Sequence, residues 1–256
     1  MQIKISVVIC TLNEEKNIER CITAALPVAD EIIVVDSGST DKTIEISQKL
    51  GARVVIHSFE GFGQQKQWAD NQASYNYILS LDADEVLSDE LKNNILDVKD
   101  NCQADGYILT RLTNYCGSWI YHGGWYPDKK LRLYDRNKGG WNLSEIHEQV
   151  EMKQGAVVKD LRGDLFHYSY TSISQHINRL EKYTFLKAQH KFKNGKKSSL
   201  VYIIFSPAVK FLKQYFFQGG FRDGYHGFII AKISAFGQFL TYARLYEIAH
   251  RQKSNK

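Results

Sequence analysis

The sequence predicts an α/β protein built on a doubly wound, mostly parallel sheet flanked by helices. Four short runs of aliphatic and β-branched residues alternate with segments of helical periodicity, as in a sheet whose strands are joined by helices. Three of these runs end in a cluster of polar residues. With 256 residues, 43% of them hydrophobic, the chain can bury a sizeable core.

Each element follows from its local pattern. Residues 3–10 are almost continuously apolar and β-branched, which is typical of a strand buried on both faces. Residues 14–25 carry apolar side chains at helical spacing, and Pro27 is expected to end that helix. Ser39 or Thr40 is expected to cap the next one. The predicted strands are residues 3–10, 31–35, 53–57, 77–81, 106–111 and 130–134. The predicted helices are residues 14–25, about 41–50, 64–73, 89–98, 174–192, 200–217 and 226–250.

The polar clusters at residues 11–14, 36–41 and 82–85 each follow a predicted strand. In a parallel sheet of this kind, ligands bind outside the carboxyl ends of the strands. We therefore expect the three clusters to meet at one edge of the sheet and to form a single site there.

Three acids, Asp82, Asp84 and Glu85, follow the predicted strand 77–81. Because burying an unpaired carboxylate costs several kcal/mol, we expect them at an exposed strand end. On an extended backbone Asp82 and Asp84 point to the same side, and two hard oxygen donors there suit Mg²⁺ or Mn²⁺. A second interpretation is that they are acids favoured near the start of a helix capped by Ser88.

Two further positions suit a nucleotide. Asp36 can accept hydrogen bonds from a base or a ribose hydroxyl, and Gly38 allows a close backbone approach; an ordinary turn is the alternative. Lys66 lies near the start of a predicted helix, where it and backbone N–H groups can meet a diphosphate; a solvated lysine is the alternative.

Composition suggests the compartment and the partner. Four cysteines without metal-ligand spacing and an N-terminal apolar run too short for a signal peptide predict a reduced, cytoplasmic protein. Residues 179–256 hold 15 Lys and Arg against 3 Asp and Glu, a balance of +12, whereas residues 1–178 have a balance of −7. The basic end is expected to meet an anionic partner: a membrane surface, a nucleic acid or an acidic glycolipid.

The longest uncharged stretch of the tail, residues 198–209, is shorter than the roughly 20 apolar residues that a spanning helix needs. No transmembrane segment is therefore predicted. Apolar residues at helical spacing with Lys210 and Lys213 among them predict an interfacial amphipathic helix. Packing against the rest of the chain or a second subunit is the alternative.

Three motifs, in this order and at this spacing, resemble the family 2 glycosyltransferases. They are Val-Val-Ile-Cys-Thr-Leu-Asn-Glu-Glu at 7–15, Val-Val-Asp-Ser-Gly-Ser-Thr-Asp at 34–41 and Leu-Asp-Ala-Asp-Glu at 81–85. Trp-Tyr-Pro-Asp at 125–128, Leu-Arg-Leu-Tyr at 131–134 and His-Glu at 147–148 resemble the branch that includes lipopolysaccharide core β-1,4-glucosyltransferases.

The resemblance implies a GT-A-type fold and an enzyme that transfers a hexose with inversion, most simply glucose from UDP-glucose, to a lipopolysaccharide inner-core heptose or a similar lipid-linked glycan. It implies a divalent cation, Mg²⁺ or Mn²⁺, as cofactor. The implied nucleotide-sugar contacts are Thr11, Asn13, Glu14, Asp36, Gly38, Lys66, Asp82 and Ala83. The implied metal ligands are Asp84, Asp82 and His167.

Inversion requires a base for the acceptor hydroxyl. Glu148 is the predicted base and Asp128 the second candidate; a surface acid is the alternative role for Glu148. The expected acceptor contacts are Trp125, Asp128 and Arg132. Arg132 could grip a phosphate or pair with Asp135 or Asp128. His167 and Trp125 are also compatible with purely structural roles.

The expected organisation is a glycosyltransferase domain at residues 1–195, with a nucleotide-sugar half at about 1–100 and an acceptor half at about 101–195, followed by a basic amphipathic helical extension at 196–256. The expected location is cytoplasmic, at the inner face of the cytoplasmic membrane. Two rival functions are a metal-dependent nucleotidyltransferase and a nucleic-acid-binding protein. The first usually has a glycine-rich loop after its first strand, where this chain has Thr-Leu-Asn-Glu-Glu; the second fits poorly with an acidic body.

Overall fold

A computed structural model describes residues 2–142 and 148–254 and divides the chain into two compact units. The first unit is residues 1–112 and 128–168, and the second is residues 113–127 and 169–256. This division differs from the predicted boundary at residue 195. The helix that the sequence placed at the end of the first domain packs instead with the C-terminal helix of the second unit, where Arg244 Nη1 donates to Thr184 Oγ1 at 2.8 Å.

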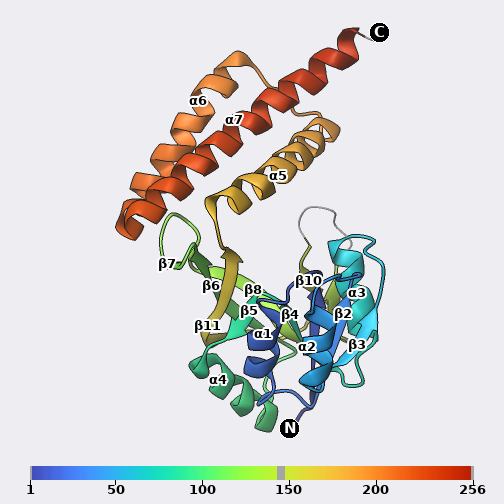
Figure 1. Ribbon diagram of the computed structural model, residues 1–256. Coiled ribbons are helices and arrows are strands. Elements are labelled where there is room, and N and C mark those ends of the chain that lie inside the picture. The colour runs from blue at the N-terminus through green and yellow to red at the C-terminus, as the bar shows by residue number, and fades with distance from the viewer. Residues whose placement is uncertain (1, 143–147, 255–256) are drawn as a thin grey trace. The chain divides into compact units, whose positions relative to one another are not determined.

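The strands and helices alternate as predicted through the first half of the chain (Figure 1). The strands of the first half are β1 (Ile5–Thr11), β2 (Glu31–Asp36), β3 (Arg53–Ile56), β4 (Tyr77–Asp82) and β5 (Glu85–Leu87). The helices between and after them are α1 (Ile18–Ala25), α2 (Thr43–Lys49), α3 (Phe62–Asn71) and α4 (Asp89–Asp100).

The second half contains more strands than the sequence predicted. They are β6 (Gly106–Tyr115), β7 (Ser118–Ile120), β8 (Asp128–Asp135), β9 (Gly139–Trp141), β10 (Val150–Met152) and β11 (Val158–Tyr170). The helices that follow are α5 (Ile173–Lys193), α6 (Leu200–Leu212) and α7 (Gly224–Ser254), with a π-helical turn (Lys213–Phe217) and a 3₁₀ turn (Gly220–Asp223) between α6 and α7.

The main sheet has the strand order β3-β2-β1-β4-β8-β6-β11-β5. The strands β3, β2, β1 and β4 are parallel, and β8 then joins β4 in the antiparallel direction. The predicted GT-A-type α/β class, with a helical C-terminal extension, is confirmed. The antiparallel half was harder to predict because β5, β7, β9 and β10 are only three residues long.

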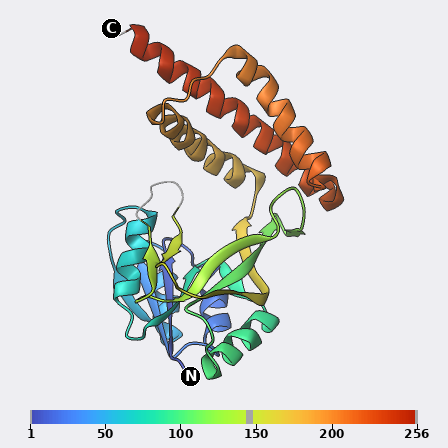
Figure 2. The same cartoon turned by 180° about the vertical axis from the view of Figure 1, so that it is seen from behind.

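Alternate side chains of β1 enter different cores, because successive residues of a strand point to opposite faces. Ile5, Val7 and Ile9 pack with α1 and α4, whereas Val8 packs with α3 and the small β9–β10 sheet. Figures 1 and 2 show helices on both faces of this sheet. Burial on both faces explains the nearly continuous apolar run of residues 3–10.

Two helix starts test the predicted caps. Ser88 accepts a hydrogen bond from Leu91 N at 3.2 Å, so it caps α4 as expected. The cap predicted for α2 is wrong, because the residue before α2 is Lys42, and Asp41 Oδ1 instead accepts from Thr43 N at 3.0 Å.

The second unit consists of α5, α6 and α7 together with β7 and the Trp- and Tyr-rich segment that follows it. Tyr115, Trp125, Tyr170 and His176 form a cluster of rings with centroids 4.7 to 6.1 Å apart. Trp125, an expected acceptor contact, packs partly buried in this cluster, which is compatible with its structural alternative; its contact with an acceptor stays a prediction.

One segment of the second unit, Leu200–Phe217, is long and apolar enough to cross a membrane by length and composition alone. Its 18 residues have a mean hydropathy of 1.2, and 6% of the segment is buried. It includes Lys210 and Lys213, whose charges were the reason for predicting no spanning helix. Length and composition alone therefore do not distinguish a spanning helix from an interfacial one.

Candidate functional site

The polar residues that follow β1, β2 and β4 meet at one edge of the sheet, as predicted. Thr11 pairs with Asp36 across β1 and β2, and Cys10 pairs with Asp82 across β1 and β4. Ser37 N donates to Thr11 O at 3.0 Å, which extends the pairing into the loops. The parallel register therefore brings residues 25 and 72 positions apart to neighbouring strand ends.

The loops after β1 and β2 are joined by hydrogen bonds. Asn13 adopts a left-handed conformation with φ of 55°, and its Oδ1 accepts from Thr40 N at 2.9 Å while its N donates to Ser39 Oγ at 2.7 Å. Glu14 N donates to Thr43 Oγ1 at 2.8 Å. These bonds hold the rim of the site in one conformation, so Asn13 and Glu14 are positioned before any ligand arrives.

Asp36 orders its own turn. The carboxylate is fully buried, and its Oδ1 accepts from Gly38 N at 2.8 Å and from Ser39 N at 2.7 Å. Gly38 has φ of +96°, which favours glycine, and a Cβ there would meet no atom within 4 Å. The open space over Gly38 leaves room for a ligand beside the turn; contact with Asp36 itself would require the turn to open.

The acids after β4 do not lie at an exposed, extended end, and that expectation was wrong. The chain turns at Ala83 and Asp84 before β5 starts at Glu85, so Asp82 and Asp84 do not alternate along one strand. Asp84 and Glu85 are buried, and Glu85 has no exposed surface. The burial of Glu85 is tolerated because Arg111 on β6 and Arg132 on β8 compensate its charge, which a local sequence pattern does not show.

A network of buried ion pairs surrounds Asp82. Lys66 Nζ lies 2.7 Å from Asp82 Oδ1, and Arg132 Nη2 lies 2.8 Å from both Asp82 Oδ2 and Glu85 Oε1. Arg111 Nη1 lies 3.3 Å from the same Glu85 oxygen. Burial by itself would raise the pKa of Asp82, but Lys66 and Arg132 outweigh it and hold that pKa well below its ordinary value. Asp82 is therefore an anion at neutral pH.

The sequence analysis proposed Asp135 or Asp128 as an ion-pair partner of Arg132, and both proposals were wrong. Arg132 pairs with Asp82 and Glu85, because β8 lies antiparallel beside β4. Asp128 pairs with Arg111 at 2.7 Å and Lys130 at 3.2 Å. Burial by itself would raise the pKa of Asp128, but the lowering effect of Arg111 and Lys130 is larger. The pKa of Asp128 therefore lies below its ordinary value. A carboxylate with a lowered pKa is a weaker base, which counts against Asp128 in that role.

Asp84 and His167 lie together, with His167 Nε2 3.4 Å from Asp84 Oδ2. The backbone of the neighbouring Tyr168 donates to Asp84 O at 2.9 Å, which fixes β11 beside the turn. Among the described residues, no group of three or more His, Cys, Asp and Glu side chains could hold a metal. A carboxylate and an imidazole nevertheless fit a divalent ion that takes its other ligands from substrate phosphates and water, as Mg²⁺ usually does. Asp82, expected as a third ligand, is engaged by Lys66 and Arg132 instead.

Glu148 lies at the wall of a cavity of about 280 Å³ in the first unit. The cavity is also lined by Lys66, Asp82 and Arg132, so the structure brings the predicted base to the ion network. Among the described residues, the lining consists of Lys66, Asp82, Arg111, Lys129, Lys130, Leu131, Arg132, Trp141, Glu148, Gln149 and Val150. Five of these residues are cations and two are acids at neutral pH, so the cavity favours an anionic ligand. His147, the other half of the His-Glu motif, lies outside the described residues.

Trp141, which sequence reasoning missed, forms part of the cavity wall. Its ring centroid lies 4.7 Å from Lys66 Nζ, and its backbone N donates to Gln67 Oε1 at 2.9 Å. Arg111 was also missed as a member of the site. The charge of Arg111 on a predicted strand was the available signal, whereas Trp141 lies on a three-residue strand with no pattern to reveal it.

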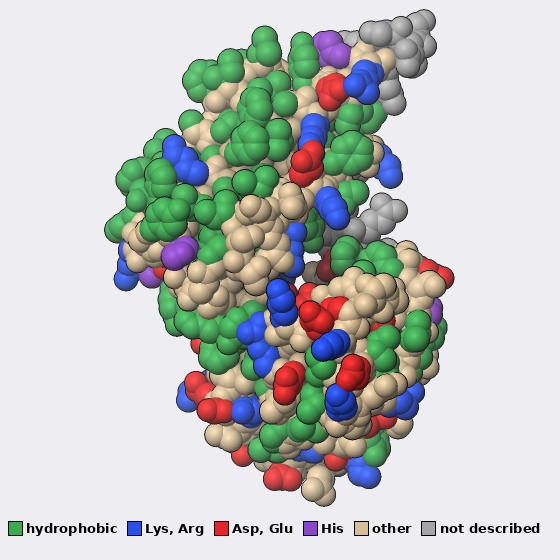
Figure 3. All heavy atoms as spheres, in the orientation of Figure 1, with side chains coloured by type: hydrophobic (Ala, Val, Ile, Leu, Met, Phe, Trp, Pro, Cys, Tyr) green, Lys and Arg blue, Asp and Glu red, His purple; other side chains and the backbone are tan. Residues whose placement is uncertain are grey.

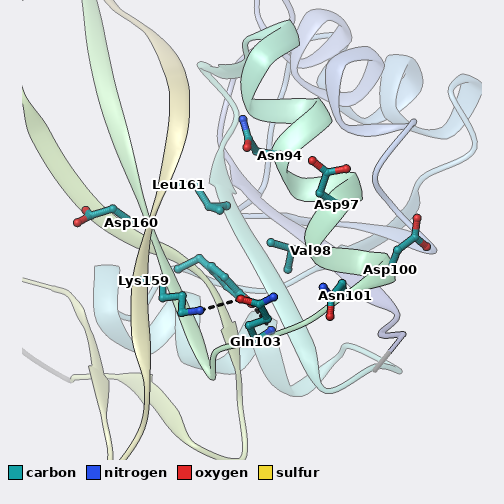
Figure 4. Close-up of a pocket in the computed structure, with 10 residues that line it drawn as sticks. Asn94, Asp97, Val98, Asp100, Asn101, Gln103, Lys159, Asp160 and Leu161 are labelled. Atoms are coloured by element: carbon teal, nitrogen blue, oxygen red, sulfur yellow. Dashed lines mark hydrogen bonds between the residues drawn. The ribbon is translucent and has the colours of Figure 1, made fainter.

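A larger cavity of about 440 Å³ shares no residue with this site. It lies against α4 and the start of β11 and is lined by Asn94, Asp97, Asp100, Asn101 and Lys159 among others (Figure 4). Lys159 Nζ donates to Gln103 Oε1 at 2.9 Å across it. None of the predicted catalytic or binding residues lines it, so volume alone does not identify the site.

Asp70 is a buried carboxyl beneath the cavity wall, where Tyr134 Oη donates to it. Burial raises the pKa of Asp70 to about 7, against the lowering effect of the Tyr134 hydrogen bond and of Lys66. Because the pKa of Asp70 is higher in the folded than in the unfolded state, protonation of its carboxyl stabilises the fold. This contribution is complete below the unfolded pKa of about 3.9. That stabilisation is lost as pH rises through about 7.

We therefore expect the free energy of unfolding of the wild type to fall between pH 4 and pH 7 relative to that of Asp70→Asn, which keeps an acceptor for Tyr134 but cannot ionise. Urea unfolding at pH 4, 5.5 and 7 measures both proteins, and their difference isolates Asp70 from other titrating groups. A difference that stays constant over this range would contradict the burial argument.

Comparisons with known proteins identify the family. The family model for glycosyl transferase family 2 matches residues 6–157. An uncharacterised glycosyltransferase of Rickettsia typhi is 33% identical over 98% of this chain and 89% of its own length. The lipopolysaccharide core biosynthesis glycosyltransferase LpsC of Rhizobium meliloti is 32% identical over 96% of this chain and 93% of its own length.

Solved structures are more distant. Glucosyl-3-phosphoglycerate synthase from Mycobacterium tuberculosis, in complex with Mn²⁺, UDP and glucosyl-3-phosphoglycerate, is 27% identical over 44% of each chain, with a TM-score of 0.36. The family model covers more than half of the chain, and the relatives match almost all of it. The chain therefore belongs to glycosyltransferase family 2.

Proposed function

We propose that this glycosyltransferase moves a hexose from a nucleotide sugar to a lipid-linked glycan with inversion, using a divalent cation. The donor is most simply UDP-glucose, and the acceptor is a heptose of the lipopolysaccharide inner core or a similar sugar. The observation that carries the proposal is the cavity that joins Glu148 to Lys66, Asp82 and Arg132. The acceptor class draws support from the similarity to LpsC, whose name assigns it to lipopolysaccharide core biosynthesis.

The donor end is proposed to lie over the ends of β1, β2 and β4. Thr11, Asn13, Asp36 and Gly38 would border the nucleoside, and Lys66 would face the diphosphate together with Asp82 and Ala83. The excess of cations around the cavity supports this, because the diphosphate is anionic. Thr11 Oγ1 is buried without a hydrogen-bond partner, which leaves one polar atom at this edge available to a ligand.

The transfer is a single in-line displacement. The acceptor hydroxyl oxygen forms a bond to the anomeric carbon while the bond from that carbon to the diphosphate oxygen breaks. Glu148 takes the hydroxyl proton, and the nucleoside diphosphate leaves with the electron pair. A cation held by Asp84 and His167 would offset the negative charge that develops on the leaving group.

The rival functions lose support. A nucleotidyltransferase would use the same class of fold, but the family to which the chain belongs transfers sugars. A nucleic-acid-binding tail would need an exposed basic surface, whereas the exposed side chains of α6 are mainly apolar. An anionic membrane surface, at the cytoplasmic face where a lipid-linked acceptor is reached, is the partner that we propose for residues 196–256.

The test is a donor-hydrolysis screen over UDP- and GDP-linked hexoses, each with Mg²⁺, with Mn²⁺ and with a chelator. We expect slow release of UDP from one UDP-hexose only when metal is present. Hydrolysis that is equally fast in the chelator would overturn metal dependence. Formation of pyrophosphate from a nucleoside triphosphate and a sugar phosphate would instead identify a nucleotidyltransferase.

The proposed metal ligands give a sharper prediction. Asp84→Asn and His167→Ala should each raise the metal concentration needed for half-maximal transfer by roughly tenfold or more, because each removes one protein ligand. The measurement is a Mn²⁺ titration of transfer activity. His190→Ala, an exposed histidine of α5 that contacts Asn194, is the matched control and should titrate like the wild type. If both site variants need the same metal concentration for half-maximal transfer as the wild type, Asp84 and His167 do not hold the metal.

A further inference from the structure

The helix α6 exposes its apolar side and buries its polar side, the opposite of a helix on a water-facing surface. Such a helix normally turns its apolar stripe toward the protein and its polar residues toward water. In α6 and the π-helical turn after it, the exposed large side chains are apolar, apart from Lys213. They are Leu200, Val201, Tyr202, Ile204, Phe205, Val209, Leu212, Phe216 and Phe217.

The polar side of this segment faces the protein. Gln214 is 2% exposed, and its Oε1 is buried without a hydrogen-bond partner. Ser206 Oγ is likewise buried without a partner, and Lys210 is half-buried. At 3.6 residues per turn, Ser206, Lys210 and Gln214 follow one another on one side of the helix, opposite Val201, Phe205 and Leu212.

The exposed apolar face continues beyond α6. Exposed apolar side chains of α7 and of the turn before it, including Phe221, Tyr225 and Phe228, extend the set within the same unit. Figure 3 shows hydrophobic side chains gathered over α6. Contiguous exposed apolar surface of this kind marks a contact with a partner or a membrane.

The charge of the second unit favours a membrane over a second protein copy as the surface that this apolar face contacts. Residues 179–256 have a balance of +12, so two copies of the second unit placed face to face would repel each other. Lys213 and Arg222 are exposed within or next to the apolar segment, where their long side chains can reach lipid headgroups. A surface that is apolar in its centre and basic at its edge fits a leaflet containing anionic lipid.

We propose that α6 lies in the plane of the membrane, with the face formed by Val201, Ile204, Phe205, Val209 and Leu212 inserted into one leaflet. The helix does not cross the bilayer, because its other side carries Ser206, Lys210 and Gln214 and packs on the protein. Binding is driven mainly by apolar contact, so it persists at salt concentrations that screen surface charges. The proposal rests on the membrane association proposed above, but not on the identity of the transferred sugar.

The chain offers a matched pair of variants. Val201→Glu/Val209→Glu places two acids on the outward face of α6, where both valines are 63% exposed. Val157→Glu/Val158→Glu makes the same change in the first unit, at valines that are 50% and 39% exposed. Full-length proteins are floated with vesicles of phosphatidylcholine alone or with phosphatidylglycerol, at 0.1 M and at 1 M NaCl, roughly the range over which the Debye length falls from 10 to 3 Å.

We expect the wild type and the Val157/Val158 variant to float equally with the anionic vesicles and to remain largely bound at 1 M NaCl. The Val201/Val209 variant should lose at least tenfold in the bound fraction at both salt concentrations. Equal flotation of all three proteins would overturn the proposal. So would a wild type that is dimeric by light scattering without lipid and does not float, since a second copy would then cover the face.

The orientation is tested separately. Leu200→Cys and Phe217→Cys mark the two ends of the segment, and the native cysteines are buried or half-buried. A membrane-impermeant thiol reagent added outside sealed vesicles should label both positions; protection of one end only would show a spanning helix. Donor hydrolysis measured without lipid reports the catalytic function independently, so a failure of one proposal is distinguishable from a failure of the other.

Discussion

Replacing Glu148 by Gln should lower the rate of glycosyl transfer by about 10²- to 10⁴-fold, the range that a positioned general base contributes. The substituted amide would keep the shape and hydrogen-bonding reach of the side chain but could not accept the hydroxyl proton. Donor binding should survive, because the cations of the cavity, Lys66 and Arg132 among them, are unchanged. Single-turnover transfer measures the loss, and calorimetric titration of the nucleoside diphosphate checks binding.

Glu151→Gln is the control for this experiment. Glu151 lies three residues away on β10, at an exposed position where it accepts from Asn142 Nδ2 at 2.8 Å, and it does not line the cavity. Its transfer rate should match that of the wild type. If Glu148→Gln transfers at the wild-type rate, Glu148 is a surface acid and the base must be sought elsewhere.

Arg132→Met should destabilise the protein by about 3–5 kcal/mol, the cost of removing one partner from a buried ion pair. Arg132 is 4% exposed and is the nearest cation to the fully buried Glu85, so its loss leaves Arg111, at 3.3 Å, and the backbone N–H of Asp82, at 3.0 Å, as the groups that stabilise this carboxylate. Met has a similar length and fills most of the volume. The measurement is the free energy of unfolding in urea.

Two further variants separate the ion network from a general loss of packing. Arg53→Met removes a half-exposed arginine whose closest contact to Glu31 is 4.0 Å, and it should cost less than about 1 kcal/mol. Arg132→Met/Glu85→Met removes both partners and should recover part of the lost stability. If the double variant were no more stable than Arg132→Met alone, Glu85 would not be the group that needs Arg132.

The local sequence determined the parallel half of the fold. The apolar runs of β1, β2 and β4 are long enough to be recognised, because burial on both faces leaves few polar residues, such as Ser6 and Ser80, within them. Because parallel strands end at one edge, the position of Thr11, Asp36 and Asp82 followed from topology alone. The order of the three motifs was sufficient to identify the family.

The environment of each carboxylate was decided by the tertiary structure. Asp82 and Asp84 are two residues apart, yet one pairs with Lys66 and Arg132 and the other lies beside His167. The sequence could not separate them, because the partners come from α3, β8 and β11, at distances of 16 to 83 residues along the chain. The same holds for the cavity wall, where Glu148 and Trp141 are brought to Lys66 by short strands with no periodicity to reveal them.

The reversed polarity of α6 also required the structure. The periodicity showed that a helix over residues 200–217 has an apolar side and a more polar side. It did not show which side faces away from the protein. Only packing on α7 decides this, and it leaves the apolar side exposed. The sequence thus determined which residues form strands, helices and motifs, because those depend on local pattern. The charge state, the partners and the exposure of each side chain depend on contacts between segments far apart, and the tertiary structure alone decided them.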